Sequence, residues 1–322
     1  MNAQDEKMMY RLFLSAVEKQ VKLRMGQQHT VELGKAMKNN SVELDTIVIR
    51  GKDENIVPNI FLNAYYDEYI GGREIESIAE DVIKVYSENK DRFDMDSIGD
   101  CSFDFLKDRI FFKLVNLEMN RKLLENLPHI VIGDLVLIFA CLVEHSSGGI
   151  ASIRIDNSLM EKWNIDTGTL LKTAQENTVR LFPPKVFELE NRNINLLLQH
   201  RLGDPDIKDL LEDDRDEEAD EDVHRWIPDG IPALFVLTNR DGVDGATCIV
   251  YQGLLERIRR RLGRGFYIIP SSVHEVLILP ENGAYNREEL DNMVRDVNSS
   301  ILSEMDILSQ NVYYYPDDSF AV

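Results

Sequence analysis

The chain has 322 residues with 57 acidic and 36 basic side chains, which gives a net charge of −21. This balance argues against a general nucleic-acid binder, because such proteins neutralise phosphates with Lys and Arg, and against docking on an anionic membrane surface. The apolar fraction of 43% and the charged fraction of 29% are typical of a globular protein, and the length allows a large core or two domains.

The cysteine content indicates a reducing compartment. Cys101, Cys141 and Cys248 are widely spaced and include no CxxC pair, so neither a disulfide framework nor a zinc-ribbon pattern is present. The N-terminal sequence has no apolar signal region, and the longest apolar run, 135–143, is far shorter than the roughly twenty residues of a membrane helix. We therefore expect a soluble, cytoplasmic protein with buried free thiols.

Residues 1–95 predict an N-terminal module of a β-sheet and helices. Apolar residues recur at helical spacing over 4–28 and over 74–89. Residues 30–37 and 42–50 have strand character, and the turn-forming residues between them predict a hairpin, with 56–63 as a candidate third strand. The economical arrangement is a β-rich layer that carries helices on one face.

A middle α/β module is expected over 96–202. Residues 103–126 fit either a strand or a helix, whereas 134–144 and 151–155 flank a Ser/Gly turn and predict a second hairpin. Helices are expected from Asn157 and over 167–178. Pro183-Pro184 ends the segment, because proline removes a backbone donor and fixes φ.

An acidic linker or loop is expected over 203–228. Twelve residues between Asp204 and Asp222 are acidic and are offset only by Lys208 and Arg215. Runs of like charge repel one another and rarely pack, so a linker or loop is favoured over a packed element.

The last part, 229–322, predicts a C-terminal ββαββα module. Strands are expected over 233–239, 246–251, 266–269 and 273–279, and helices over 253–262 and 287–300. The whole chain therefore indicates an α+β fold of two to three modules, with antiparallel or mixed sheets and helices packed on one side.

Four phrases in the sequence resemble a known family. They are Val57-Pro-Asn-Ile-Phe-Leu-Asn-Ala-Tyr-Tyr66, Trp163-Asn-Ile165 with Ala174-Gln-Glu-Asn-Thr178, Thr238-Asn-Arg-Asp-Gly242 with Gly245-Ala246, and Tyr267-Ile-Ile-Pro-Ser-Ser-Val-His-Glu275. Together they resemble bacterial domain-of-unknown-function family 5688, found in anaerobic Gram-positive bacteria, over about residues 30–315. The family has no established activity, so the resemblance implies a single coherent unit and no mechanism. It also implies that the acidic run is a variable insertion.

The sharpest site candidate is the polar group Ser271, Ser272, His274 and Glu275, set between two apolar runs. Burial of these groups is costly unless each finds a partner. On the expected strand, His274 and Glu275 point to opposite apolar faces, so the strand is expected to be central and Glu275 cannot orient the imidazole. A histidine beside two hydroxyls can act as a general base if another acid orients it. The alternatives are a turn fixed by these side chains and a contact to a ligand or partner.

No metal or cofactor site is expected. The turn Arg240–Gly245 has two Asp-Gly steps but lacks the ligand spacing of a calcium loop, so it indicates a glycine turn. The histidines have no metal-ligand spacing, and no phosphate-binding glycine motif occurs. His145-Ser146-Ser147 is similar to the Ser/His group at 271–274, and convergence of the two in space would strengthen the site hypothesis.

Two further clusters have several interpretations. The first is a group of five arginines in the helix 253–262 and just after it: Arg257, Arg259, Arg260, Arg261 and Arg264. We expect a solvated helix face, and the alternatives are docking of the acidic run and a contact to an anion or a nucleic acid. The tyrosines of 65–69 and 313–315 are expected to belong to the core, with recognition as the alternative.

These patterns predict a non-enzymatic binding or protein-interaction module with a protein as its partner, and no nucleic acid or membrane. The candidate binding residues are His274, Glu275, Asn239 and Asp241. The alternative is a hydrolase-like enzyme that uses Ser271 or Ser272 with His274. A third hypothesis, an acidic mimic of nucleic acid, requires residues 204–222 to be ordered on a folded face.

Overall fold

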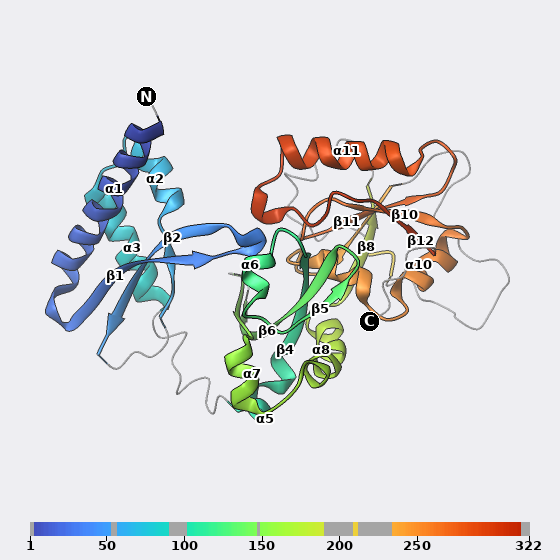
Figure 1. Cartoon of the computed structure of the whole chain (residues 1–322), viewed down its shortest axis with the longest axis horizontal. Helices are drawn as coiled ribbons and strands as arrows, with labels where there is room; N and C mark the ends of the chain where they lie inside the picture. Colours follow the sequence, from blue (N-terminus) through green and yellow to red (C-terminus); the bar gives the residue numbers. More distant parts are fainter. Residues whose placement is uncertain are drawn as a thin grey trace. The chain divides into compact units, whose positions relative to one another are not determined.

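The computed structural model of the chain describes residues 3–52, 57–89, 102–146, 149–189, 209–211 and 234–316 (Figure 1). The chain forms two compact units, Met1–Phe105 and Leu106–Val322. The second unit holds most of the expected middle module and all of the expected C-terminal module. Every strand pair among the described residues is antiparallel and each unit contains helices, which confirms the α+β class.

The first unit is a three-stranded sheet with helices. The predicted hairpin is confirmed as β1 and β2, the strands lie in the order β1-β2-β3, and the helix α2 was not predicted. The elements are α1 (Ala3–Met25), η1 (Gly26–Gln28), β1 (His29–Met37), η2 (Asn39–Ser41), β2 (Glu43–Gly51), β3 (Ile60–Phe61), α2 (Asn63–Ile70) and α3 (Ile75–Asn89).

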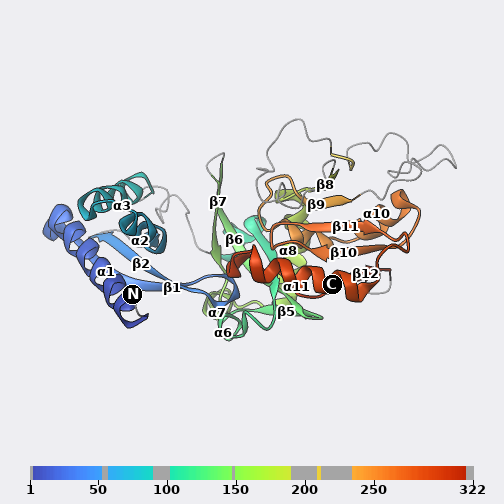
Figure 2. The ribbon, with the colours of Figure 1, turned by 90° about the horizontal axis from the view of Figure 1, so that it is seen from above.

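The core of this unit lies between the sheet and the two long helices (Figure 2). Val17 of α1, Ile47 of β2 and Ile78 of α3 are fully buried in one cluster. Tyr65, Tyr66 and Tyr69 pack against this cluster, as expected for core tyrosines. The spacing of α3 produced the expected apolar face. In α1 the expected face is wrong in part, because Met8, Leu12 and Leu23 are exposed and Phe13 and Leu14 are buried beside Val17 and Val21.

The second unit begins with a four-stranded sheet in the order β4-β6-β5, with β7 paired to β6. The hairpin predicted around the Ser/Gly turn is confirmed as β6 and β7. The ambiguous segment 103–126 contains both helical turns and a strand. The elements are α5 (Phe103–Leu106), η4 (Lys107–Arg109), β4 (Ile110–Asn116), α6 (Arg121–Leu124), β5 (His129–Ile132), β6 (Leu135–Ser146), β7 (Gly149–Arg154), α7 (Asn157–Trp163) and α8 (Thr167–Leu181).

A five-stranded sheet follows, in the order β12-β10-β11-β9-β8. β11 is the middle strand and all its residues are buried, as expected. Helix α11 lies along this sheet and packs Leu290 and Val294 against Leu279 (Figure 2). The elements are β8 (Pro184–Glu188), β9 (Phe235–Asn239), η5 (Gly245–Val250), α10 (Leu254–Leu262), β10 (Phe266–Pro270), β11 (Val276–Pro280), α11 (Arg287–Ser300), η6 (Glu304–Asp306) and β12 (Tyr313–Tyr315).

Two strand predictions in this sheet are wrong. Residues 246–251 are not a strand: η5 is a 3-10 helix whose six residues are all buried, so its apolar run was compatible with either structure. The expected ββαββα order is therefore absent. The strand expected over 273–279 begins only at Val276, after a loop. The strand β8 was not predicted, because Pro183-Pro184 was expected to end the segment. Pro184 takes the first position of an outer strand, where the missing N–H donor of proline is tolerated.

The outer edge of β4 is covered by side chains instead of by a strand. The N–H of Phe112 donates to Thr178 Oγ1 at 3.2 Å, and the N–H of Leu114 donates to Thr247 Oγ1 at 3.1 Å. Asn177 of α8 donates through Nδ2 to the carbonyl of Ile110 at 3.0 Å. Since buried backbone groups need partners, these contacts fix α8 and η5 beside β4.

Asp134, in the turn between β5 and β6, joins the two sheets of the second unit. Its carboxylate accepts hydrogen bonds from Ser309 Oγ at 2.7 Å, Asn311 Nδ2 at 2.9 Å and Tyr313 Oη at 2.8 Å. Ser309 is fully buried. One carboxylate with three donors thus ties the β5–β6 turn to the segment that leads into β12.

Several predictions fall outside the described residues: Cys101, Ser147 and the acidic run, except for Asp209–Leu211. Cys141 and Cys248 are buried free thiols, as expected. No helix in the described part of the chain is long and apolar enough to cross a bilayer.

Candidate functional site

The polar residues 271–275 form the loop that joins β10 to β11. Ser271 Oγ and Ser272 Oγ donate to Glu275 Oε1 at 3.3 and 3.2 Å, and the N–H of His274 donates to Ser272 Oγ at 3.0 Å. Burial raises the pKa of Glu275, and the charge of His274 and the serine hydroxyls oppose this effect. These contacts close a hairpin loop on itself. Because the strand starts after it, alternation of faces does not describe His274 and Glu275.

The imidazole of His274 is held from two sides. Nδ1 accepts a hydrogen bond from the N–H of Asp244 at 3.2 Å, so the neutral ring carries its proton on Nε2. Nε2 lies 3.6 Å from Asp306 Oδ1. Asp306 raises the pKa of His274, opposed by burial and supported by the charge of Asp244. An acid does face the imidazole, as the hydrolase hypothesis requires, and it comes from η6.

The loop between β9 and η5 is organised by Asn239, which is 2% exposed. Its Nδ2 donates to the carbonyl of Val243 at 2.7 Å, and its Oδ1 accepts from the N–H of Asp241 at 3.1 Å. Gly242 has a φ of 64°, which favours glycine. Asn239 therefore uses its amide to shape the loop that carries Asp241 and Asp244.

The loop 240–244 lies between the two histidine segments that the sequence singled out. His145 Nε2 lies 2.8 Å from Asp241 Oδ1, while the backbone of Asp244 contacts His274. The carboxylate of Asp244 pairs with Lys113 at 2.8 Å. The segments of His145 and His274 thus each contact this loop, through Asp241 and Asp244.

Gly245 is the point at which this loop packs on the hairpin loop. A Cβ at this position would lie 2.0 Å from Thr238 Oγ1, 2.4 Å from the carbonyl oxygen of His274 and 2.7 Å from the nitrogen of Asn239. Thr238 Oγ1 itself donates to the carbonyl of His274 at 2.7 Å. Only glycine allows the two backbones to approach this closely.

The polar side chains of this region contact one another. Within the described contacts, both serine hydroxyls donate to Glu275, and the two imidazole nitrogens face Asp244 and Asp306, so no hydroxyl–imidazole pair is formed. A cavity lined by Asn239 and Asp244 measures about 10 Å³, room for about one water molecule. No group of described His, Cys, Asp or Glu side chains could hold a metal ion.

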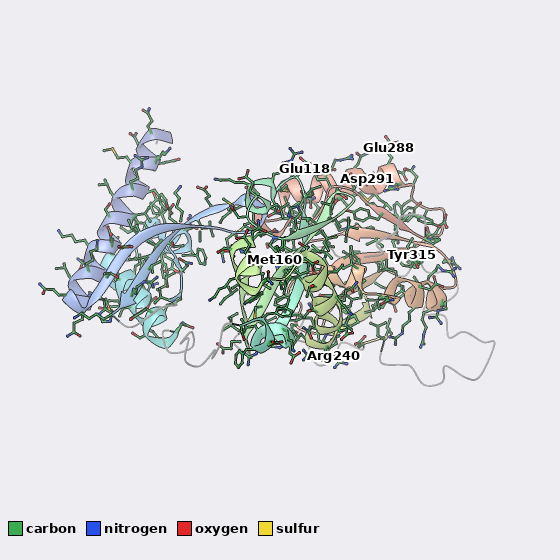
Figure 3. All side chains as sticks on the ribbon, turned by 60° about the horizontal axis from the view of Figure 1, so that its bottom comes forward. Glu118, Met160, Arg240, Glu288, Asp291 and Tyr315 are labelled. Atoms are coloured by element: carbon green, nitrogen blue, oxygen red, sulfur yellow. The ribbon has the colours of Figure 1, made fainter. Side chains whose placement is uncertain are left out.

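A larger hollow, which we name the α8–α10 cleft, lies elsewhere on the second unit. It has a volume of about 730 Å³ and lies between α8 on one side and the end of η5 with the start of α10 on the other. Phe112 and Tyr251 line it, and Tyr315, labelled in Figure 3, contributes from β12. Its lining residues come from four separate stretches of the sequence, and they include Gln175 and Glu176 of the family phrase 174–178.

The cleft combines an open helix face with an apolar wall. Lys172, Gln175, Glu176 and Val179 recur at intervals of three and four on α8 and line one side. Opposite them, Ile249, Val250 and Leu255 are part of the buried core. Arg259 binds Glu256 with two hydrogen bonds of 2.9 Å and lowers the pKa of that carboxyl, so Glu256 is held in its charged form.

The arginines of α10 differ in what they contact. Arg257 donates to the carbonyl of Leu211 at 2.9 Å, and Arg264, which follows the end of α10, donates to the carbonyl of Glu281 at 3.3 Å. Arg260 is exposed. The contact of Arg257 places one described piece of the acidic run, Asp209–Leu211, beside the basic helix.

A family of unknown function, DUF5688, matches residues 10–317, nearly the whole chain. The chain belongs to this family. No curated protein and no solved structure matches it. The phrases that carried the resemblance have identifiable tasks in the fold: Asn177 and Thr178 cover the edge of β4, and Thr238 and Gly245 hold the two loops together.

Proposed function

We propose that the protein is a non-enzymatic protein-interaction module that binds a polypeptide segment of a partner in the α8–α10 cleft. The volume of the cleft carries this proposal. At about 730 Å³ it lies within the range of about 300–1,000 Å³ that is typical of ligand sites. The cavity beside Asp244, in contrast, has room for about one water molecule.

The shape of the cleft favours a polypeptide over a small metabolite. From Lys172 to Val179 the lining runs along two turns of α8, about 10 Å at the rise of an α-helix. Val179 is 39% exposed on this face. An open helix face opposite a wall of aliphatic side chains suits a segment with alternating polar and apolar contacts.

The groups that line the cleft support binding rather than catalysis. The described lining contains no serine, cysteine or histidine that could act as a nucleophile or base. The carboxylate of Glu256 is held charged by Arg259, so it is not poised to donate a proton. Tyr251 also lines the cleft, and its hydroxyl donates a hydrogen bond to the carbonyl of Phe182 at 3.0 Å, so it stabilises the fold.

The charge of the protein favours a basic partner segment. A net charge of −21 attracts cationic surfaces over distances of about a Debye length and raises the rate of encounter. At the cleft, Glu176 is an exposed carboxylate that can pair with a lysine or arginine of the partner. We place this interaction in the cytoplasm, which the buried free thiols of Cys141 and Cys248 support.

The test is selection of random twelve-residue peptides displayed on phage against the full chain. Selected peptides are expected to contain both basic and apolar residues. Their affinity is then compared on Val179→Lys, which removes an apolar contact and repels a basic segment, and on Val131→Lys. Val131 is 53% exposed on β5 and does not line the cleft.

We expect Val179→Lys to weaken binding of the selected peptides by about tenfold or more, as at a buried contact of an interface, while Val131→Lys leaves it unchanged. Equal binding to both variants, or selected peptides with an acidic bias, would contradict the proposal. The same substitution is used at both positions, so a general effect of charge is controlled.

A further inference from the structure

β8 is an outer strand of the five-stranded sheet, and its free edge is occupied by a short segment, Asp209–Leu211. The N–H of Leu210 donates to the carbonyl of Val186 at 2.7 Å, and the N–H of Val186 donates to Asp209 Oδ1 at 3.2 Å. Both outward backbone groups of Val186 therefore have a partner. This is the pattern by which an extended peptide adds to the edge of a sheet.

Helix α10 contacts the same segment from the other side. Arg257 Nη2 donates to the carbonyl of Leu211 at 2.9 Å, and Leu211 is only 7% exposed. Asp209 Oδ1 also accepts from the N–H of Leu211 at 3.0 Å, which folds the aspartate back over the leucine. Three features hold the segment: an aspartate on the strand edge, a buried leucine and a guanidinium on its carbonyl.

The sequence that follows the segment and the helix α10 carry opposite charges. The residues that follow Leu211 in the sequence are Glu212, Asp213 and Asp214, while α10 presents arginines at 257 and at 259–261. Burial lowers the pKa of Arg257, and the charge of Asp209 opposes this effect, so the carboxylate favours the charged guanidinium.

We propose that the edge of β8 together with Arg257 is a recognition site for an acidic polypeptide segment that contains the order Asp-Leu-Leu. Asp209–Leu211 occupies the site within the chain, and a partner segment of the same chemistry competes for it. The site is separate from the α8–α10 cleft, which is lined by Gly253, Leu255 and Glu256 of the same helix. Because Asp209–Leu211 belongs to the same chain, its effective concentration at the site is high, and a partner must bind tightly enough to displace it.

The test uses a fluorescent synthetic peptide with the sequence of residues 205–216, and anisotropy as the readout. It is titrated into the full chain and into a chain with Asp209→Ala and Leu211→Ser, whose site is vacated. We expect the vacated chain to bind at least about tenfold more tightly than the unaltered chain, since no internal segment competes. Adding Arg257→Ala to the vacated chain should reverse the gain.

A peptide of the same composition in shuffled order separates recognition from charge. Equal binding of both peptides, or equal binding to the vacated and unaltered chains, would overturn the proposal. Lack of binding to a vacated chain that keeps its near-ultraviolet circular dichroism would also overturn it.

A second measurement decides the matter if the vacated chain does not fold. In the otherwise unaltered chain, Arg257→Gln is expected to speed hydrogen exchange of the Leu210 amide by about tenfold or more, because the segment loses one contact. Arg260→Gln, on the same helix, is the matched control and should leave this amide unchanged. The same exchange rate in both variants would overturn the proposal.

Discussion

Gly245→Ala is the sharpest test of the packing between the loop 239–245 and the hairpin loop. The added Cβ would lie 2.0 Å from Thr238 Oγ1 and 2.4 Å from the carbonyl oxygen of His274, whereas real Cβ contacts are 3.0 Å or longer. Thr238 can rotate away only by losing its hydrogen bond to that carbonyl, a cost of about 1 kcal/mol. The backbone contacts cannot rotate away, and overpacking of this kind costs about 1–3 kcal/mol more.

We therefore expect Gly245→Ala to lower the free energy of unfolding of the second unit by about 2–4 kcal/mol. Urea denaturation followed by tryptophan fluorescence excludes the first unit, because neither of the two tryptophans, Trp163 and Trp226, lies within residues 1–105 of the sequence. Gly168→Ala is the control: its Cβ would meet only Asp166 Oδ1 at 3.6 Å inside α8, so a gain of about 0.5–1 kcal/mol is expected. Similar denaturation midpoints for the two variants would refute the reasoning.

Three further predictions concern the polar contacts of the second unit. Asp134→Ala should lower the free energy of unfolding of the second unit by about 2–4 kcal/mol, because Ser309, Asn311 and Tyr313 lose their acceptor. The control in the same urea assay is Glu118→Ala, which removes an exposed ion pair and should change this free energy by about 0.5 kcal/mol or less. Thr247→Val should lower the free energy of unfolding by about 1–3 kcal/mol, because the N–H of Leu114 is left without an acceptor. Thr247→Ser keeps the hydroxyl and should keep most of the stability. Wild-type stability of the valine variant would contradict the account of the β4 edge. Asp306 raises the pKa of His274, so the stabilisation that its charge provides is complete below the unfolded pKa of about 6.5 and is lost as pH rises through the folded pKa. His274→Asn should abolish this loss, and an unchanged pH profile of the free energy of unfolding would show that another group titrates.

The sequence predicted the helices and hairpins whose periodicity is clear. α1, α3 and α11 carry apolar residues at helical spacing, and β1–β2 and β6–β7 flank turn-forming residues. η5 was mistaken for a strand because all its residues are buried, so no polar face remained to show a helical period. β8 was missed because its Pro184 is tolerated only at an outer position, which is a property of the sheet and not of the local sequence.

The candidate site was predicted in part. The sequence identified the polar residues at 271–275 and the loop with Asn239 and Asp241, but it did not show that these groups are occupied with one another. Such contacts depend on which loops meet, as Gly245 and the carbonyl of His274 do. The α8–α10 cleft was not predicted, since Phe112, Val179 and Tyr315 come together only in the folded chain.

The most direct test of the proposed function is amide hydrogen exchange of the full chain with and without a peptide selected on it. Our account predicts slower exchange confined to α8 and to residues 249–256, which line the cleft. Slower exchange in the loop 271–275 or in the first unit, with no change along α8, would contradict it.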